Sequence, residues 1–279
     1  MERLFGNKLK MLRRRIQKAT VSPSDTTPTI SVIYAWARSG ATVLNKCLSA
    51  MEHLVLSETH PKINTGVHSP RWQATHWYNI DIPKGTLWSS CILKLNDIAV
   101  KQDRSLIVRD WTVASFYPSD VHDPLRIRQL QAHKVLGERC KPVAYIRNAI
   151  DCALSFATFH HWTAARQLDS FARAYLQYAR RIKQDAIPLV YYEDFCQNPT
   201  RFLAELCITL GIRFSDKWQN FSDVIKILGD TYTAQKRGSR AVELLQIKRL
   251  PRRKIISQLQ RHIVMNKELH LANKLLGIK

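Results

Sequence analysis

The segment 31-SVIYAWARSGATVLNKCLSAM-51 joins an apolar run to a helical pattern through a short polar loop. The run Ile30–Trp36 is almost entirely apolar, as in a strand that is buried on both faces of a sheet. A helix is expected from Thr42 to His53, because apolar residues recur there every three or four positions. The loop 38-RSGAT-42 offers a guanidinium group, two hydroxyls and a glycine, and the helix N-terminus adds partial positive charge. The segment therefore predicts a strand-loop-helix unit that binds an anion.

Three further apolar runs predict buried strands, and helical patterns follow each of them. The expected strands are Ser105–Val108, Pro142–Ile146 and Ile187–Tyr192, and the expected helices are Pro124–Glu138, Ile150–Trp162, Leu168–Asp185 and Pro199–Leu210. This alternation predicts an α/β fold of three layers, in which helices cover both faces of a mostly parallel sheet. Ligands in such sheets bind beyond the carboxyl ends of the strands, and the loop 38–42 lies at one of these ends.

Three segments outside this alternation have a different character. Residues 1–28 are expected to form a basic extension that is loosely attached, because the join SPSDTTP is rich in turn-forming residues. The stretch Ser57–Ser89 is rich in His, Trp, Pro and Asn and is expected to be a long irregular loop. Residues 29–279 are expected to form a single domain whose tail, from Pro251 onward, is basic and helical.

The composition is strongly basic, with 43 Lys and Arg against 22 Asp and Glu and a net charge of +21. Such a surface attracts nucleotides, acidic polymers, phospholipid headgroups and nucleic acids. The six cysteines form no CxxC pair and the histidines lack zinc-site spacing, so reduced thiols and no metal are expected. Because no secretory signal or run of 18 apolar residues is found, a cytoplasmic protein is expected.

A second candidate anion site follows the expected strand Pro142–Ile146. Arg147 stands at the end of this strand, and Ser155 lies eight positions later on the following helix, away from its apolar stripe. Taken singly, Arg147 is more simply read as an ion-pair partner of Asp151 and Ser155 as a solvent-facing helix residue. Taken together, the two side chains can converge on a phosphate across the strand-to-helix turn.

Three motifs now stand in a fixed order along the chain. They are 38-RSGAT-42, 147-RNAIDCALS-155 and 192-YEDFCQNP-199. This set resembles the sulfotransferases that use 3′-phosphoadenosine 5′-phosphosulfate, and the resemblance spans about residues 30–240. It implies a P-loop NTPase-like sulfotransferase architecture. It also implies transfer of a sulfuryl group from that donor to a hydroxyl or amine of a carbohydrate, lipid or other small acceptor, without a metal.

The resemblance further implies roles for individual residues. The residues that would contact the 5′-phosphosulfate are Arg38, Ser39, Gly40, Ala41 and Thr42. Arg147 and Ser155 would hold the 3′-phosphate, and Tyr192 would lie near the adenine. The basic segment 235-QKRGSR-240 is the counterpart of a family segment that closes over the 3′-phosphate, although it also reads as a solvated basic loop. Its candidate contacts are Lys236, Arg237 and Gly238.

The sequence departs from the family pattern in the first loop. Ala37 replaces the usual proline and Ala41 replaces a threonine. The lost hydroxyl removes a hydrogen bond worth roughly 1 kcal/mol net, while the backbone amide remains. Val43 stands where many small-molecule sulfotransferases have a tryptophan, which argues against a phenol- or steroid-type enzyme.

The catalytic base is the least defined part of the predicted site. The cytosolic branch of the family uses a histidine after its second strand, and 107-IVRDWT-112 contains none. The branch that acts on proteins and some sugars has a glutamate about twenty positions beyond the loop arginine, which points to Glu58. His60 is the second candidate and Asp110 the third. Arg109 matches a basic residue that several branches hold near the sulfuryl group.

Two other functions stay open at this point. A P-loop kinase is disfavoured because the loop lacks the G-K-[ST] sequence. A non-catalytic binder of nucleic acid or anionic membrane would use the +21 charge and would not need Arg147 or Ser155. For the sulfotransferase reading, the expected partners are a small-molecule, glycan or lipid acceptor and an anionic membrane surface contacted by the basic termini. No specific nucleic acid is expected, and the oligomeric state is left open.

Overall fold

The computed structural model describes residues 29–117, 129–162, 165–224 and 257–278, together with positions 227, 247, 249 and 255. The expected extension, residues 1–28, lies outside the described residues. None of the helices in the described ranges is both long enough and apolar enough to cross a membrane.

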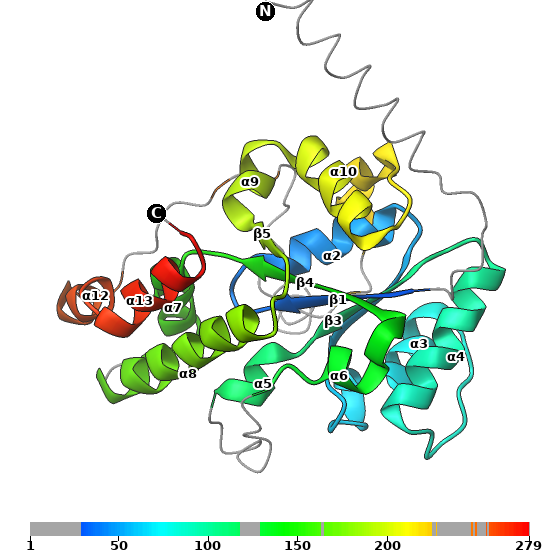
Figure 1. The fold of residues 1–279 in the computed structure, drawn as a ribbon, viewed down its shortest axis with the longest axis horizontal. Coiled ribbons are helices and arrows are strands. Elements are labelled where there is room, and N and C mark those ends of the chain that lie inside the picture. The colour runs from blue at the N-terminus through cyan, green and yellow to red at the C-terminus, as the bar shows by residue number, and fades with distance from the viewer. Residues whose placement is uncertain are drawn as a thin grey trace, which may run out of the picture.

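The centre of the fold is a five-stranded sheet in the order β2-β3-β1-β4-β5, and every paired strand runs parallel to its neighbour (Figure 1). The strands are β1 (Ile30–Ala35), β2 (Leu54–Thr59), β3 (Leu106–Asp110), β4 (Cys140–Ile146) and β5 (Leu189–Tyr191). Each of the four expected apolar runs overlaps a strand, so the predicted parallel α/β fold is confirmed, although the run Ile187–Tyr192 contributes only Leu189–Tyr191.

The packing of the central strand β1 shows why its sequence is almost entirely apolar. Ile30, Val32 and Tyr34 point to one face of the sheet and join the larger hydrophobic cluster. Ile33 and Ala35 point to the other face and join the second cluster. Because helices cover both faces, every position of this strand is removed from solvent, and its one polar residue, Ser31, is small and fully buried.

Helices form the two outer layers of the molecule (Figure 1). One face of the sheet is covered by α2 (Ala41–Ala50), α9 (Tyr192–Gln197), α10 (Pro199–Leu210) and the 3₁₀ segment η4 (Asp216–Asp223). The other face is covered by α3 (Pro70–Tyr78), α4 (Trp88–Lys101), α5 (Thr112–Phe116), α6 (Ala132–Leu136), α7 (Ala149–Phe159), α8 (Ala165–Gln184), α12 (Ser257–Val264) and α13 (Lys267–Leu275). The predicted three-layer architecture is thus confirmed.

Helix α10 matches its expected bounds, Pro199–Leu210, at both ends. The Asn198 side chain accepts a hydrogen bond from the Arg201 amide at 3.1 Å, and proline occupies the first turn. Gly211 ends the helix with φ of 70°, a left-handed conformation that glycine adopts without a steric penalty.

The prediction of an irregular loop over Ser57–Ser89 is wrong in part. The last residues of β2 extend to Thr59, a short 3₁₀ turn η1 spans Gly66–His68, and α3 follows it. The sequence concealed β2 because its end, Ser57–Thr59, is polar. Those residues are nevertheless largely buried, and side chains from the next two elements bond the Ser57 amide and the Glu58 carbonyl.

The helix expected over Pro124–Glu138 is observed only in part. Residues 118–128 lie outside the described residues, and the α-helical conformation covers Ala132–Leu136. It ends at Gly137, whose φ is 60°, and a 3₁₀ turn, η3 (Gly137–Arg139), leads directly into β4.

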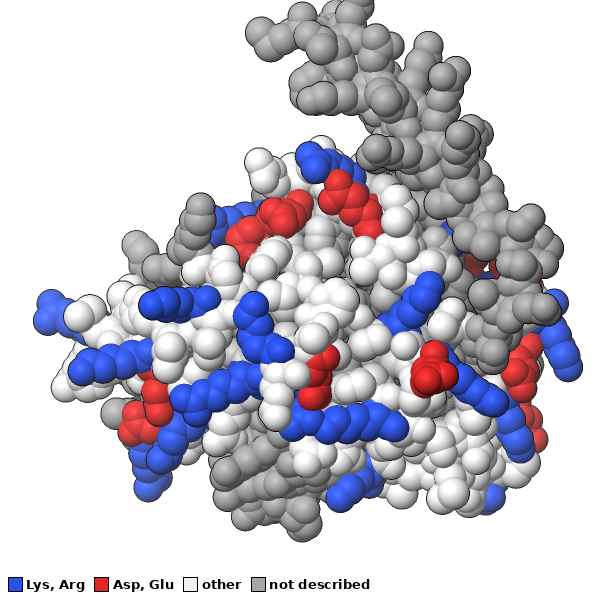
Figure 2. All heavy atoms as spheres, viewed as in Figure 1, with Lys and Arg blue, Asp and Glu red and all other residues white. Residues whose placement is uncertain are grey.

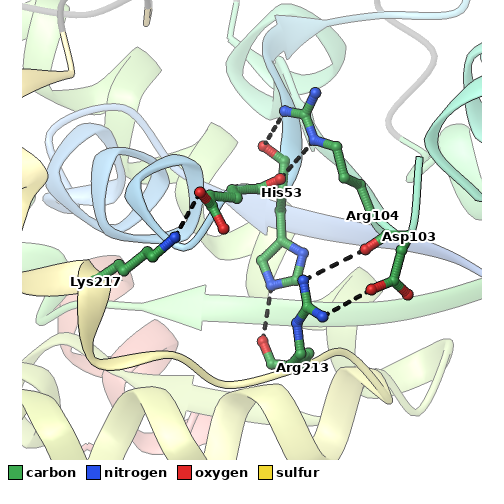
Figure 3. Close-up of polar contacts among 6 residues, drawn as sticks. His53, Asp103, Arg104, Arg213 and Lys217 are labelled. Carbon is green, nitrogen blue, oxygen red and sulfur yellow. Dashed lines mark hydrogen bonds and ion pairs between the residues drawn. The ribbon is translucent and has the colours of Figure 1, made fainter.

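A polar cluster joins the amino-terminal ends of β2 and β3 to the segment after α10 (Figure 3). Its members are Glu52, His53, Asp103, Arg104, Arg213 and Lys217. The buried His53 ring donates from Nε2 to the Arg213 carbonyl at 2.9 Å, and Arg104 Nη2 donates to the His53 carbonyl at 3.2 Å. This cluster stabilises the end of the sheet where β2 and β3 begin, opposite to the carboxyl ends of the strands.

Candidate functional site

The two candidate anion loops lie side by side at the carboxyl ends of neighbouring strands. Strands β1 and β4 pair in parallel up to Ala35 and Tyr145, so the loop 36–40 and the turn Arg147–Asn148 leave the sheet at the same edge. Each loop leads into the N-terminus of a helix, α2 after the first and α7 after the second. The topology therefore brings together two segments about 110 residues apart in sequence.

Direct hydrogen bonds join the two loops. Arg147 Nη1 donates to the carbonyl oxygen of Arg38 at 2.9 Å. Arg38 Nε in turn donates to Ser155 Oγ at 3.1 Å. The three predicted side chains thus form one cluster, and Arg38 reaches across from the first loop to the pair on α7.

Arg147 is buried and held on several sides. Its guanidinium lies 4.4 Å from the centroid of the Tyr192 ring, and the Tyr175 hydroxyl donates to its carbonyl at 2.8 Å. Arg147 is 8% exposed, and its Nε makes no hydrogen bond within the described residues. A buried guanidinium with an unused donor is suited to bind an anion.

The N-termini of α2 and α7 differ in whether their backbone amides already donate hydrogen bonds to described groups. In α7, the Asn148 side chain accepts from the amides of Ile150 and Asp151, and Asn273 accepts from the amide of Ala149. In α2, the capping residue is Gly40, and no described group accepts a hydrogen bond from the amides at positions 40–42. Only the α2 N-terminus therefore presents backbone donors to an anion, whereas α7 contributes side chains.

Gly40 is required by the packing of the first loop. Its φ is 89°, and a Cβ atom placed on it would lie 2.9 Å from two ring carbons of Tyr192. The Tyr192 ring therefore packs against Gly40 and contacts the Arg147 guanidinium. The neighbouring Ser39 is 1% exposed, and its hydroxyl has no hydrogen-bond partner among the described residues.

A second cationic group lies at the ends of β2 and β3. Arg109 Nη2 forms an ion pair with Glu58 Oε1 at 3.0 Å. The Arg109 side chain is 5% exposed, and its Nε and Nη1 have no partner among the described groups. The Glu58 side chain is 21% exposed, so solvent can reach its carboxylate, whereas the Arg109 side chain is buried.

The same architecture is found in solved structures. The sulfotransferase domain from the curacin biosynthetic pathway is similar with a TM-score of 0.53 and 16% sequence identity, covering 91% of this chain and 99% of that one. The sulfotransferase domain of the Synechococcus PCC 7002 olefin synthase gives 0.50 and 17%, covering 91% and 97%. This chain has the sulfotransferase fold. No protein-family model and no curated protein sequence matches it.

Within this sulfotransferase fold, sequence reasoning missed the residues that hold Glu58. Gln73, on α3, bonds both backbone groups of Ser57: Oε1 accepts from its amide at 2.8 Å, and Nε2 donates to its carbonyl at 2.6 Å. His68 Nδ1 donates to the Glu58 carbonyl at 2.9 Å. Glu58 has φ of 54°, a strained conformation for a residue with a side chain. No sequence pattern signals these contacts, because they join a strand end to a helix 16 residues away.

The other two candidate bases are buried. His60 is fully buried, with Nε2 2.9 Å from Ser115 Oγ and Nδ1 accepting from the Lys62 amide at 3.1 Å. Asp110 is 1% exposed, and burial raises its pKa to about 7, against the smaller opposing effects of Thr112 and Arg109. Among the three candidates, only Glu58 combines solvent access with contact to Arg109.

The resemblance predicts that the segment 235-QKRGSR-240 closes over the 3′-phosphate. Lys236, Arg237 and Gly238 lie outside the described residues. Within the described ranges, no group of three or more His, Cys, Asp and Glu side chains could hold a metal ion.

Proposed function

We propose that this chain is a sulfotransferase that moves a sulfuryl group from 3′-phosphoadenosine 5′-phosphosulfate to a hydroxyl or amine. The acceptor class that we propose is a carbohydrate, a lipid or another small molecule. The observation that carries the proposal is the convergence of Arg38, Arg147 and Ser155 beside the open N-terminus of α2. This arrangement offers two adjoining groups of anion-binding donors, as a doubly phosphorylated nucleotide requires.

The donor set fits such a nucleotide. Arg147 and Ser155 would hold the 3′-phosphate, using the unpartnered Nε of Arg147 and the Ser155 hydroxyl. The amides of Gly40, Ala41 and Thr42, with the unpartnered Ser39 hydroxyl, would hold the 5′-phosphosulfate. Arg38 stands between the two groups. Tyr192, packed on Gly40, would border the adenine.

The Glu58–Arg109 pair would border the reacting atoms. The bound donor supplies an electrophilic sulfuryl group. Glu58 would take the proton of the acceptor hydroxyl or amine, and the free Nε and Nη1 of Arg109 would offset negative charge at the reacting centre. His60 is a weaker candidate for this role, because both of its ring nitrogens are already engaged by protein groups.

Contact with an anionic membrane remains a prediction for the basic termini. Figure 2 shows Lys and Arg side chains gathered on the side of the molecule where α8, α12 and α13 lie in Figure 1. Arg261, Lys267 and Lys274 are exposed there. This charge would also draw an anionic nucleotide or acceptor toward the protein.

Thermal unfolding with adenosine 3′,5′-bisphosphate tests the proposal. The nucleotide should raise the melting temperature of the wild-type protein, because a ligand at a hundred times its Kd stabilises the folded state by about 2.7 kcal/mol. The shift should shrink strongly in Arg38→Ala and Arg147→Ala. Arg201→Ala is the matched control, because the Arg201 side chain is 69% exposed and pairs with Glu205 on the surface of α10.

Two results would overturn the proposal. One is the absence of any shift in the wild-type protein, and the other is a shift of equal size in Arg147→Ala. Either result, combined with salt-sensitive binding to polyanions, would favour the non-catalytic binder.

A further inference from the structure

The C-terminal helix α13 is hydrogen-bonded to both segments that flank the candidate nucleotide site. Asn273 Oδ1 accepts from the amide of Ala149 at 2.7 Å, and Asn273 is 7% exposed. Nearer the end of the chain, the Tyr191 hydroxyl donates to the Leu276 carbonyl at 3.0 Å. The helix also packs against α7 and α8, beside which it lies in Figure 1.

The bond to Ala149 completes the N-terminus of α7. Ala149 is fully buried, so its amide would be unsatisfied without the Asn273 side chain. Asn148 accepts from the next two amides. The turn between β4 and α7 is therefore fixed by two asparagines, one local and one 124 residues away in sequence.

This turn sets the relative positions of the two predicted phosphate-binding side chains. Arg147 stands directly before the turn, and Ser155 lies in the second turn of α7. Any change in the angle at which α7 leaves β4 moves Ser155 relative to the Arg147 guanidinium. On the β5 side, Tyr191 precedes Tyr192, whose ring lies against the same guanidinium.

We propose that Asn273 is a positioning residue for binding the 3′-phosphate of a nucleotide. It acts through the amide of Ala149 and does not contact the phosphate. The Tyr191–Leu276 bond would help in the same way, by holding the strand end before Tyr192, whose ring contacts the Arg147 guanidinium. This inference rests on the proposed function, because it concerns the same nucleotide site.

The test measures the Kd values of adenosine 3′,5′-bisphosphate and adenosine 5′-phosphate by calorimetry. In Asn273→Ala, binding of the bisphosphate should weaken about tenfold, as expected when a charge-assisted contact is misplaced. Binding of adenosine 5′-phosphate, which lacks the 3′-phosphate, should change by no more than about twofold. The selectivity between the two nucleotides is therefore the quantity that a purely structural role would leave unchanged.

Asn266→Ala is the matched control. Asn266 caps the same helix by accepting from the Leu269 amide at 3.0 Å, and no hydrogen bond among the described residues joins it to α7. This variant should lose stability by loosening α13 and should keep the wild-type selectivity. Tyr191→Phe serves as a milder second variant if Asn273→Ala does not fold, and its bisphosphate Kd should rise about threefold.

The outcomes separate the two claims. If the wild-type protein does not bind the bisphosphate, the proposed function fails. If the wild type binds it, but Asn273→Ala, or Tyr191→Phe in its place, keeps full selectivity, the positioning role is wrong and the proposed function stands. An equal loss in Asn266→Ala would also overturn the positioning role, because the effect would then be general to the helix.

Discussion

At the scale of single residues, the contact between Gly40 and Tyr192 determines how closely the loop 38–42 packs against the Tyr192 ring. The left-handed backbone of Gly40 and the absence of a Cβ atom let the aromatic ring pack directly on the loop. The same ring contacts the Arg147 guanidinium. Through Tyr192, the conformation of Gly40 at the α2 N-terminus therefore affects the position of the buried Arg147 guanidinium.

Gly40→Ala should lower both stability and nucleotide affinity. A side chain at positive φ costs on the order of 1 kcal/mol, and the new Cβ would lie 2.9 Å from the Tyr192 ring and displace it from Arg147. Urea unfolding measures the first effect, and the thermal shift with adenosine 3′,5′-bisphosphate measures the second.

Gly66→Ala is the control for this change. Gly66 has φ of 62°, but a Cβ there would meet no atom within 4 Å. It should therefore show the backbone cost alone and bind the nucleotide normally. Normal nucleotide binding by Gly40→Ala would mean that the Tyr192 contact does not shape the site.

At the scale of elements, the end of β2 depends on α3 and on the turn before it. Gln73 replaces a missing strand partner by bonding the amide and the carbonyl of Ser57, and its Nε2 also donates to the Val67 carbonyl at 2.8 Å. These hydrogen bonds hold the residue directly before Glu58. The Glu58 backbone is strained, and its carboxylate pairs with Arg109. Helix α3 and the turn before it thus support the strand end that carries the candidate base.

Gln73→Ala should destabilise the protein by about 3 kcal/mol, because it leaves buried amide and carbonyl groups unsatisfied at about 1–3 kcal/mol each. Chemical denaturation gives this value directly. Thr75→Ala, on the exposed side of the same helix, removes one hydrogen bond of 3.3 Å and should cost far less. A loss below about 1 kcal/mol for Gln73→Ala would show that the backbone groups find other partners.

At the scale of the whole molecule, buried ionisable groups make stability depend on pH in two opposite ways. Burial lowers the pKa of His53, and partial burial lowers that of His133, below the ordinary value of 6.5. As the pH falls below 6.5, the unfolded chain takes up protons before the folded protein does, so these histidines reduce stability. Asp110 has the opposite effect, because its folded pKa of about 7 lies above the ordinary 3.8, and its contribution to stability declines as the pH rises from 3.8 to 7.

Single variants should separate the two effects. In His53→Gln, the loss of melting temperature below pH 6.5 should be smaller than in the wild type, since an amide can still donate to the Arg213 carbonyl. In Asp110→Asn, stability relative to the wild type should increase as the pH rises from 4 toward 7 and then level off. Melting curves between pH 4 and 8 measure both trends. Profiles parallel to that of the wild type would contradict these assignments.

The sequence by itself determined the features that depend on local chemistry. The strand β1, the helix Pro199–Leu210 and the parallel α/β class all follow from the periodicity of apolar residues. The R-S-G loop and Arg147 each follow an apolar run, which also predicted that both candidate anion sites lie at strand ends. These predictions succeed because each one concerns residues that are neighbours along the chain.

Only the tertiary structure decided how these pieces meet. The bonds from Arg147 to Arg38 and from Ala149 to Asn273 join residues more than a hundred positions apart, and Gln73 on α3 bonds both backbone groups of Ser57 in β2. A hydrogen bond between distant segments leaves no periodic pattern in either of them. It forms because the sheet order brings the strand ends together, and because burial there makes any unpaired polar group costly.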